Sequence, residues 1–204
     1  MSPIVSTLAA ASAKGYGGLG ASVVTASGAF ESIATYTAAS NQSSIVFDNI
    51  PTNYQHLQVR AITRASVSGI SALGYALVNN NTTTGDYFFY HLVTGDQSGV
   101  INQYVDASSQ AGLGFILHTI GNTGASDYFS PSVIDFIDSN NTNKFKNMKN
   151  QVGFVGGSGQ ECQVRMVSST FKSTAAITKL EFIIAGSNFM TNSQIALYGI
   201  KGAS

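Results

Sequence analysis

The feature that most limits what this chain can fold into is a period of two in its side chains, which begins near Glu31 and continues towards the C-terminus. Leu57 and Val59, for example, alternate with His56 and Gln58. Successive side chains of a β-strand point to opposite faces of its sheet, so this pattern predicts strands that bury one face. The sequence shows no long segment with the 3.6-residue period of a helix, which argues against alternating helix–strand units.

About ten short segments follow this pattern, and clusters of Gly, Asn, Asp, Ser and Pro separate them. A single helical turn is expected over 102–105 or 107–111. Many short strands divided by turn residues predict one all-β domain, a jelly-roll-like β-sandwich. The predicted strands are 32–37, 44–47, 56–64, 73–78, 87–93, 115–120, 132–137, 148–155, 162–171, 180–184 and 194–200.

The first thirty residues differ from the rest because they consist largely of Ala, Ser and Gly. We therefore divide the chain into an N-terminal arm, residues 1–30, and a β-sandwich domain, residues 31–204. Two interpretations of the arm are open: a flexible terminus, or a segment that becomes ordered on a partner and anchors the domain there. In the second interpretation the anchoring residues are Leu8, Ala11, Lys14, Gly15, Tyr16, Gly17 and Leu19.

Charge is scarce and balanced, since ten basic and ten acidic residues make up only 10% of the chain. Proteins that bind nucleic acid usually carry a basic face, so no nucleic-acid partner is expected. The one dense cluster of lysines, Lys144, Lys146 and Lys149, is either a solvated loop or a phosphate site. No run of about 18 apolar residues is present, so no membrane insertion is expected.

Residues that carry chemistry are few and scattered. His56, His91 and His118 show no metal-ligand spacing, so each is expected to pack or hydrogen-bond within a sheet. The single cysteine, Cys162, excludes a disulfide framework, and its alternating segment predicts a small core residue. We therefore expect no enzymatic activity, no catalytic residue, no metal and no cofactor.

Aromatic side chains are the clearest candidates for contact with another molecule. The four consecutive aromatic residues 87–90 must divide between the two sides of a strand, with one pair facing the core. The outward pair is an oligomer interface or a platform on which a sugar ring stacks, unless the strand is buried on both faces. Together with aromatic residues expected in loops, the candidate interface or glycan contacts are Tyr87, Tyr90, Tyr104, Tyr128 and Phe129.

Three segments of the chain resemble a group of virion proteins of tailed bacteriophages, common in phages of cyanobacteria and other aquatic bacteria. These segments are 50–60 (IPTNYQHLQVR), 133–146 (VIDFIDSNNTNKFK) and 196–202 (ALYGIKG). The opening 11–17 (ASAKGYG) also resembles the start of several such tail or appendage proteins. The resemblance covers roughly residues 31–202 and implies a multimeric structural or receptor-facing virion protein with a jelly-roll-like domain. It implies no catalytic residues.

These patterns lead to one leading functional hypothesis and several alternatives. The first is a virion structural protein, a tail fibre, baseplate appendage or adaptor that anchors to other virion proteins through its arm. Its copies would pack through a sheet face, with a trimer as the favoured homo-oligomer. The alternatives are a capsid decoration protein and a carbohydrate-binding module for a host-surface glycan, while the scarcity of acidic residues argues against a glycan-cleaving enzyme. Residues 1–13 lack the pattern of a signal peptide, so synthesis in the host cytoplasm and delivery to the virion by assembly are expected.

Overall fold

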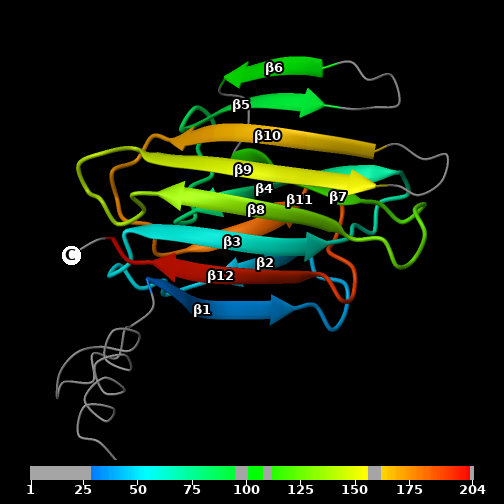
Figure 1. The fold of residues 1–204 in the computed structure, drawn as a ribbon, viewed down its shortest axis with the longest axis horizontal. Coiled ribbons are helices and arrows are strands. Elements are labelled where there is room, and N and C mark those ends of the chain that lie inside the picture. The colour runs from blue at the N-terminus through cyan, green and yellow to red at the C-terminus, as the bar shows by residue number, and fades with distance from the viewer. Residues whose placement is uncertain (1–28, 95–100, 108–111, 156–161, 203–204) are drawn as a thin grey trace, which may run out of the picture.

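The structure, a computed structural model, describes residues 29–94, 101–107, 112–155 and 162–202. The regular structure in these ranges consists of β-strands, arranged in two antiparallel sheets that form the two layers of a sandwich (Figure 1). The prediction of an all-β sandwich is therefore confirmed. The proposed anchoring residues of the arm, between positions 8 and 19, lie outside the described residues.

Twelve strands build the two sheets, and turn residues end several of them. Asn79 and Asn80 directly after β4, and Asp138 directly after β8, adopt positive φ angles, which Asn and Asp tolerate better than most residues. The strands are β1 (Phe30–Thr37), β2 (Ser44–Phe47), β3 (His56–Thr63), β4 (Ser71–Val78), β5 (Tyr87–Thr94), β6 (Ile101–Ala107), β7 (Leu113–Ile120), β8 (Ser130–Ile137), β9 (Lys146–Val155), β10 (Cys162–Phe171), β11 (Leu180–Ile184) and β12 (Gln194–Ile200).

The strand order is that of a jelly roll with two added hairpins. Four strands in the order β1-β12-β3-β8 form one layer, and β2-β11-β4-β7 form the other. The chain passes back and forth between these two groups, as a jelly roll requires. The hairpins β5–β6 and β9–β10 interrupt this alternation after β4 and after β8, and both join the first layer. The resulting eight-stranded sheet, β1-β12-β3-β8-β9-β10-β5-β6, has twice as many strands as its partner (Figure 1).

The hydrophobic core lies between the two sheets. Leu57 and Phe136 from the larger sheet, and Leu180 and Phe182 from the smaller one, are buried in one continuous apolar cluster. Phe182 also meets Phe47 edge to face, with 6.1 Å between the ring centroids. Each side chain of this size stabilises the fold by about 1.5–3 kcal/mol when it is fully buried. The core therefore accounts for the inward half of the alternating pattern.

Strand β7 covers the inner side of three of the added strands, because it packs against β5, β9 and β10 as well as β8. Across this contact Asn150 donates a hydrogen bond from Nδ2 to the carbonyl of Ile116 at 2.7 Å. The ring of His118 lies edge-on to that of Phe154, with 4.5 Å between centroids, so the prediction that this histidine packs within the sheet layers is confirmed. The smaller sheet thus covers one side of the larger sheet, and the other side faces solvent.

The structure excludes one of the two positions expected for a helical turn. Residues 102–105 lie within β6 and pair with β5, whereas most of the alternative position, 107–111, lies outside the described residues. Pairing with a neighbouring strand supplies interstrand backbone hydrogen bonds, and a single isolated helical turn gains little in comparison. The other strands coincide with predicted segments and differ from them by a few residues at their ends.

Candidate functional site

The solvent side of the eight-stranded sheet is the most extensive candidate site, and we call it the open face. Along its central strands, buried side chains alternate with side chains that face away from the smaller sheet. Figure 1 looks onto this side, with the smaller sheet behind. On β3, β8, β9 and β10 the open face consists of Gln58, Arg60, Ile62, Pro131, Val133, Asp135, Ile137, Asn147, Lys149, Gln151, Gly153, Val155, Val164, Met166 and Ser168.

Aliphatic side chains cross the middle of the open face and form an apolar band, which we define as Ile62, Pro131, Val133, Val164 and Met166. Apart from Pro131, which is also exposed, these side chains are 41–51% exposed. Strand pairing places Ile62 opposite Pro131, and only β9 separates Val133 from Met166. Aliphatic side chains that gather on one exposed face mark a contact surface, so the apolar band is a candidate interface.

A shallow hollow of about 270 Å³ interrupts the apolar band at Gly153. A Cβ atom at this position would lie 2.8 Å from the carbonyl oxygen of Gln163, so a larger residue would force the backbone to shift. An adjoining hollow of about 160 Å³ includes Asp135 and Lys149 in its lining. The open face is therefore not flat. Besides Gly153, the larger hollow is lined by Pro131, Ser132, Val133, Gln151, Val152 and Val164.

Polar side chains border the apolar band. Asp135 accepts a hydrogen bond from Nε2 of Gln58 at 2.7 Å and lies opposite Lys149 in the strand register. Arg60 donates from Nε to Oε1 of Gln58 at 2.9 Å, and its guanidinium lies over the ring of Phe30, 5.2 Å from the centroid. Both signs of charge are present on this border, so it suits a partner of mixed charge better than a polyanion.

In the first half of β10 the polarity of the strand is reversed: the apolar side chains lie on the open face and the polar ones face inwards. Val164 and Met166 are exposed, whereas Gln163 and Arg165 face the inner side and are half-buried. Cys162 shares the exposed side, so the prediction of a core position for this cysteine is wrong. The alternation itself is as expected, but the apolar side of this half-strand points away from the core.

The apolar band was not predicted from the sequence, although β8 carries a signal for it. Val133 and Ile137 are exposed at positions that alternate with the buried residues Ile134 and Phe136. A strand that is apolar on both sides usually lies between two layers. Only one side of β8 is covered by the described part of this chain, so Val133 and Ile137 on its other side are candidates for contact with another molecule.

The aromatic run 87–90 divides between the two sides of β5, as its alternation predicts. Tyr87 is fully buried, its ring stacks on Phe171 with 4.8 Å between centroids, and its hydroxyl donates to the carbonyl of Asn81 at 2.7 Å. Burial raises the pKa of Tyr87 to about 12. The prediction of Tyr87 as an interface or glycan contact is therefore wrong, whereas Tyr90 is exposed on the side of the open face.

The loop after β7 presents Tyr128, which is exposed, and Phe129, which is half-buried. Buried Arg64 holds this loop: its Nη2 donates to the carbonyl of Gly124 at 2.6 Å, and its Nη1 donates to the carbonyls of Tyr128, at 3.2 Å, and Ala125. Hydrogen bonds from a charged donor are stronger than neutral ones, so Arg64 restrains the backbone of this loop, including that of Tyr128. The exposed ring of Tyr128 is a candidate contact.

The remaining predicted contact, Tyr104, does not lie in a loop. Its backbone is part of β6, opposite His91 of β5. The side chains of both residues are outside the described part of the structure. Tyr104 and Tyr90 therefore belong to neighbouring strands of the larger sheet, whereas Tyr128 lies in the loop after β7.

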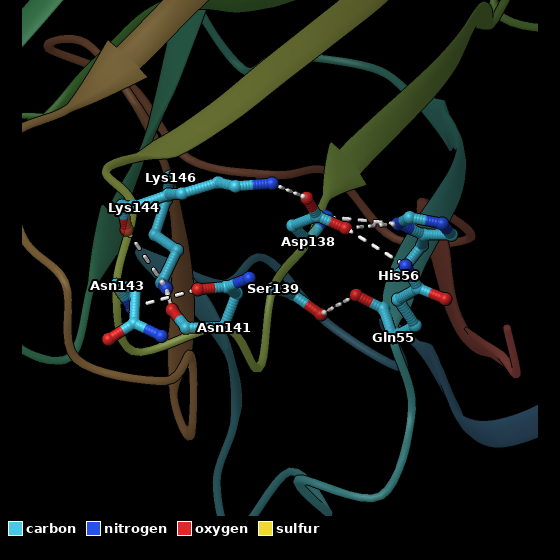
Figure 2. Close-up of polar contacts among 8 residues, drawn as sticks. All are labelled: Gln55, His56, Asp138, Ser139, Asn141, Asn143, Lys144 and Lys146. Carbon is cyan, nitrogen blue, oxygen red and sulfur yellow. Dashed lines mark hydrogen bonds and ion pairs between the residues drawn. The ribbon is translucent and has the colours of Figure 1, made fainter.

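A polar cluster ties the turn after β8 to the start of β3 (Figure 2). The backbone N–H of Asp138 donates to Nδ1 of His56 at 2.9 Å, so that ring nitrogen carries no proton. The Asp138 carboxylate accepts from Nε2 of Gln55 and from Nζ of Lys144, each at 3.1 Å, and these hydrogen bonds hold its pKa below the ordinary value. The cluster fixes the turn and confirms that His56 hydrogen-bonds beside a sheet.

Lys146 is buried at the start of β9, against the expectation of a solvated lysine loop. Its Nζ donates to the carbonyl of Asn141 and weakly to that of Lys144 at 3.4 Å (Figure 2). It also donates to the carbonyl of Thr174 at 3.2 Å. Burial lowers the pKa of Lys146. Lys144 is exposed in the turn before β9, as a solvated loop predicts, whereas Lys149 is exposed within β9 on the open face. Because the central amine of the cluster already binds backbone carbonyls, the cluster is better suited to fixing loops than to binding phosphate.

Within the described ranges, no group of three or more His, Cys, Asp and Glu side chains is placed to hold a metal ion. The same ranges contain no helix long and apolar enough to cross a membrane. No protein-family model matches the chain, and no curated protein matches it. Among the described residues, the open face and the loop that presents Tyr128 are the candidate contact surfaces.

Proposed function

We propose that this chain is a structural protein of a tailed-bacteriophage particle: a tail fibre, baseplate appendage or adaptor that works as a homo-oligomer. The observation that carries the proposal is the reversed polarity of β10, with Val164 and Met166 facing solvent and Arg165 facing inwards. A domain that functions alone would gain from the opposite arrangement, because each aliphatic side chain stabilises by about 1.5–3 kcal/mol when buried. The arrangement supports a sheet that is completed by another subunit.

The segments that resemble phage virion proteins lie together in the fold, which supports their origin in one structural unit. The segment 50–60 enters β3, 133–146 runs from β8 into β9, and 196–202 includes most of β12. Strands β12, β3 and β8 are neighbours in the larger sheet (Figure 1). Contacts also join these segments at the sheet's end, where the N–H of Ser139 donates to the carbonyl of Gln55 at 2.8 Å.

The proposal assigns anchoring to the arm, and the point where the arm leaves the domain is fixed. Glu31 accepts hydrogen bonds from Nζ of Lys201 at 2.7 Å and from the hydroxyl of Tyr54 at 2.9 Å. The backbone N–H of Lys201 donates to the carbonyl of Ala29 at 2.9 Å. These contacts hold the start of the first strand against the end of the last one, so we expect the domain to fold without residues 1–22.

Deletion of residues 1–22 tests this assignment. The truncated protein should give the same β-type circular dichroism spectrum and the same unfolding midpoint as the full chain, but it should be absent from purified particles. Mass spectrometry of particles from an infection in which only the truncated protein is supplied provides the readout. Normal incorporation of the truncated protein would show that the arm is not the anchor. Imaging of whole particles then distinguishes a tail or baseplate position from a capsid decoration protein.

A host-glycan contact is the second candidate function, and the loop fixed by Arg64 favours it. The Tyr128 ring is 40% exposed on a loop whose backbone Arg64 restrains, so a sugar ring can stack on it at small entropic cost to the loop. Binding of the purified protein to host-surface polysaccharide should weaken at least about tenfold in Tyr128→Ala, the loss expected for one stacking contact of about 1.4 kcal/mol. The matched control is Phe145→Ala, another exposed aromatic residue, in the turn after β8. Equal binding by both variants would remove this loop from consideration.

A further inference from the structure

We propose that the open face is the surface through which two copies of this chain bind each other, sheet to sheet, around a two-fold axis near Gly153. The inference rests on the proposed function, because it specifies how the subunits of the homo-oligomer meet, and it replaces the trimer expected from the sequence with a two-fold pair. The occupant is a second copy of the chain, and three properties of the face support that choice.

The first property is shape. A two-fold interface brings the same surface together from both subunits, so every protrusion must find a recess on the same face. The open face carries both, since the hollow at Gly153 lies beside the protruding side chains of Val133 and Met166. Each copy can therefore place an aliphatic side chain in the hollow of the other.

The second property is charge. The chain has a formal net charge of zero, so two copies do not repel each other at long range. At the border of the apolar band, Asp135 lies opposite Lys149 on β9 and Gln58 on β3, and Gln58 in turn accepts a hydrogen bond from Arg60. A face with both signs of charge on one border can form complementary pairs with its own copy.

The third property is area. Eight strands about 4.8 Å apart, each about eight residues long, give the sheet a footprint of about 1,000 Å². A stable interface of standard size buries about 800 Å² on each partner, which this sheet can supply. Two sheets that pack face to face lie about 10 Å apart, so side chains the size of valine and methionine fill the space between them.

The outer side of the smaller sheet is a weaker candidate. Among the described residues, its only large hydrophobic side chain that is more than 36% exposed is Val46, at 37%. The open face has four such side chains in the apolar band alone. Val46 therefore provides a matched control, because it is a valine of similar exposure in a β-strand of the same domain.

Sedimentation of the purified full-length protein tests the proposal. Wild type should form dimers or larger even-numbered assemblies at about 10 μM, and Val133→Lys should raise the dissociation constant at least about tenfold, because the pairing would bury unpaired ammonium groups. Val46→Lys should sediment as wild type does. Circular dichroism confirms that both variants are folded, as their exposure predicts. A monomeric or trimeric wild type at about 100 μM, or an unchanged Val133→Lys, would overturn the proposal.

Chemical cross-linking gives a second test that does not depend on weakening the assembly. Gln151 lines both hollows, so its copies should approach each other across the two-fold axis. In a Cys162→Ser background, Gln151→Cys should be joined into covalent dimers by a short bismaleimide, and the same background without the new cysteine should not. Failure to cross-link at a concentration where wild type is dimeric would contradict face-to-face pairing.

The two proposals fail in different ways. If the open face does not pair two copies, sedimentation and cross-linking show it, whatever the protein's place in a particle. If the chain dimerises through this face but is missing from purified particles, the virion function is wrong and the interface stands. Mass spectrometry of particles therefore tests the function without reference to the interface.

Discussion

Replacement of Lys146 by methionine tests the conclusion that this buried amine fixes the loops at one end of the sandwich. Methionine keeps the length of the side chain and removes the three hydrogen bonds to the carbonyls of Thr174, Asn141 and Lys144. Loss of a hydrogen bond from a charged donor costs about 1.5–3 kcal/mol, so the two shorter bonds together contribute about 3–6 kcal/mol.

Part of this loss is offset, because the variant no longer buries a charge. Burial lowers the pKa of Lys146, which shows that the site penalises the ammonium form. We therefore expect a net destabilisation of about 2–4 kcal/mol. With a urea m-value of about 2–3 kcal/mol/M for a chain of this length, the unfolding midpoint should fall by about 1 M.

The matched control is Lys144→Met, which removes an exposed amine that pairs with Asp138 at 3.1 Å. Exposed ion pairs contribute about 0–1 kcal/mol, so its midpoint should fall by less than about 0.4 M. Urea unfolding followed by circular dichroism measures both variants. Equal midpoints for Lys146→Met and Lys144→Met would refute the structural role assigned to the buried amine.

Three further predictions follow from the core, the polar cluster and the loop after β7. Phe182→Ala should destabilise the domain by about 3–5 kcal/mol, because it opens a cavity between the sheets, and thermal or urea unfolding measures the loss. Asp138→Asn should be less stable than wild type at pH 7. Since the folded-state pKa of Asp138 is lowered, the contribution of its carboxylate is present above the ordinary value of 3.8 and disappears as pH falls through the lowered pKa. The difference between the two proteins in unfolding free energy should shrink accordingly below pH 3.8, and a constant difference would contradict this reasoning. Arg64→Met should accelerate amide hydrogen exchange in residues 122–129 more than in β3, and equal acceleration in both would show that the arginine supports the whole domain and not this loop.

Much of the fold could be predicted because strand formation is encoded locally. Leu57 and Val59 alternate with His56 and Gln58 whatever the rest of the chain does, and the turn residues that end each strand act over a few positions. The strand β6 was not predicted, because its local sequence gives no clear strand signal. It depends on pairing with β5, which comes earlier in the chain.

The candidate site could be predicted only in part, because exposure depends on what lies above each strand. The division of the aromatic run between Tyr87 and Tyr90 follows from alternation, but which of the two faces the core does not. Lys146 and Lys149 are the same residue type, but Lys146 tolerates burial because the turn before β9 and the segment after β10 bring the carbonyls of Asn141 and Thr174 to its amine.

The sequence by itself determined that this chain would form short alternating strands with few charges, since both properties can be read from neighbouring residues. The tertiary structure alone decided that the smaller sheet covers one side of the larger sheet and leaves the other exposed. The apolar side of β10, with Val164 and Met166, therefore faces solvent. The physical reason is that alternation fixes two opposite faces on every strand, while only the packing of layers decides which face is buried.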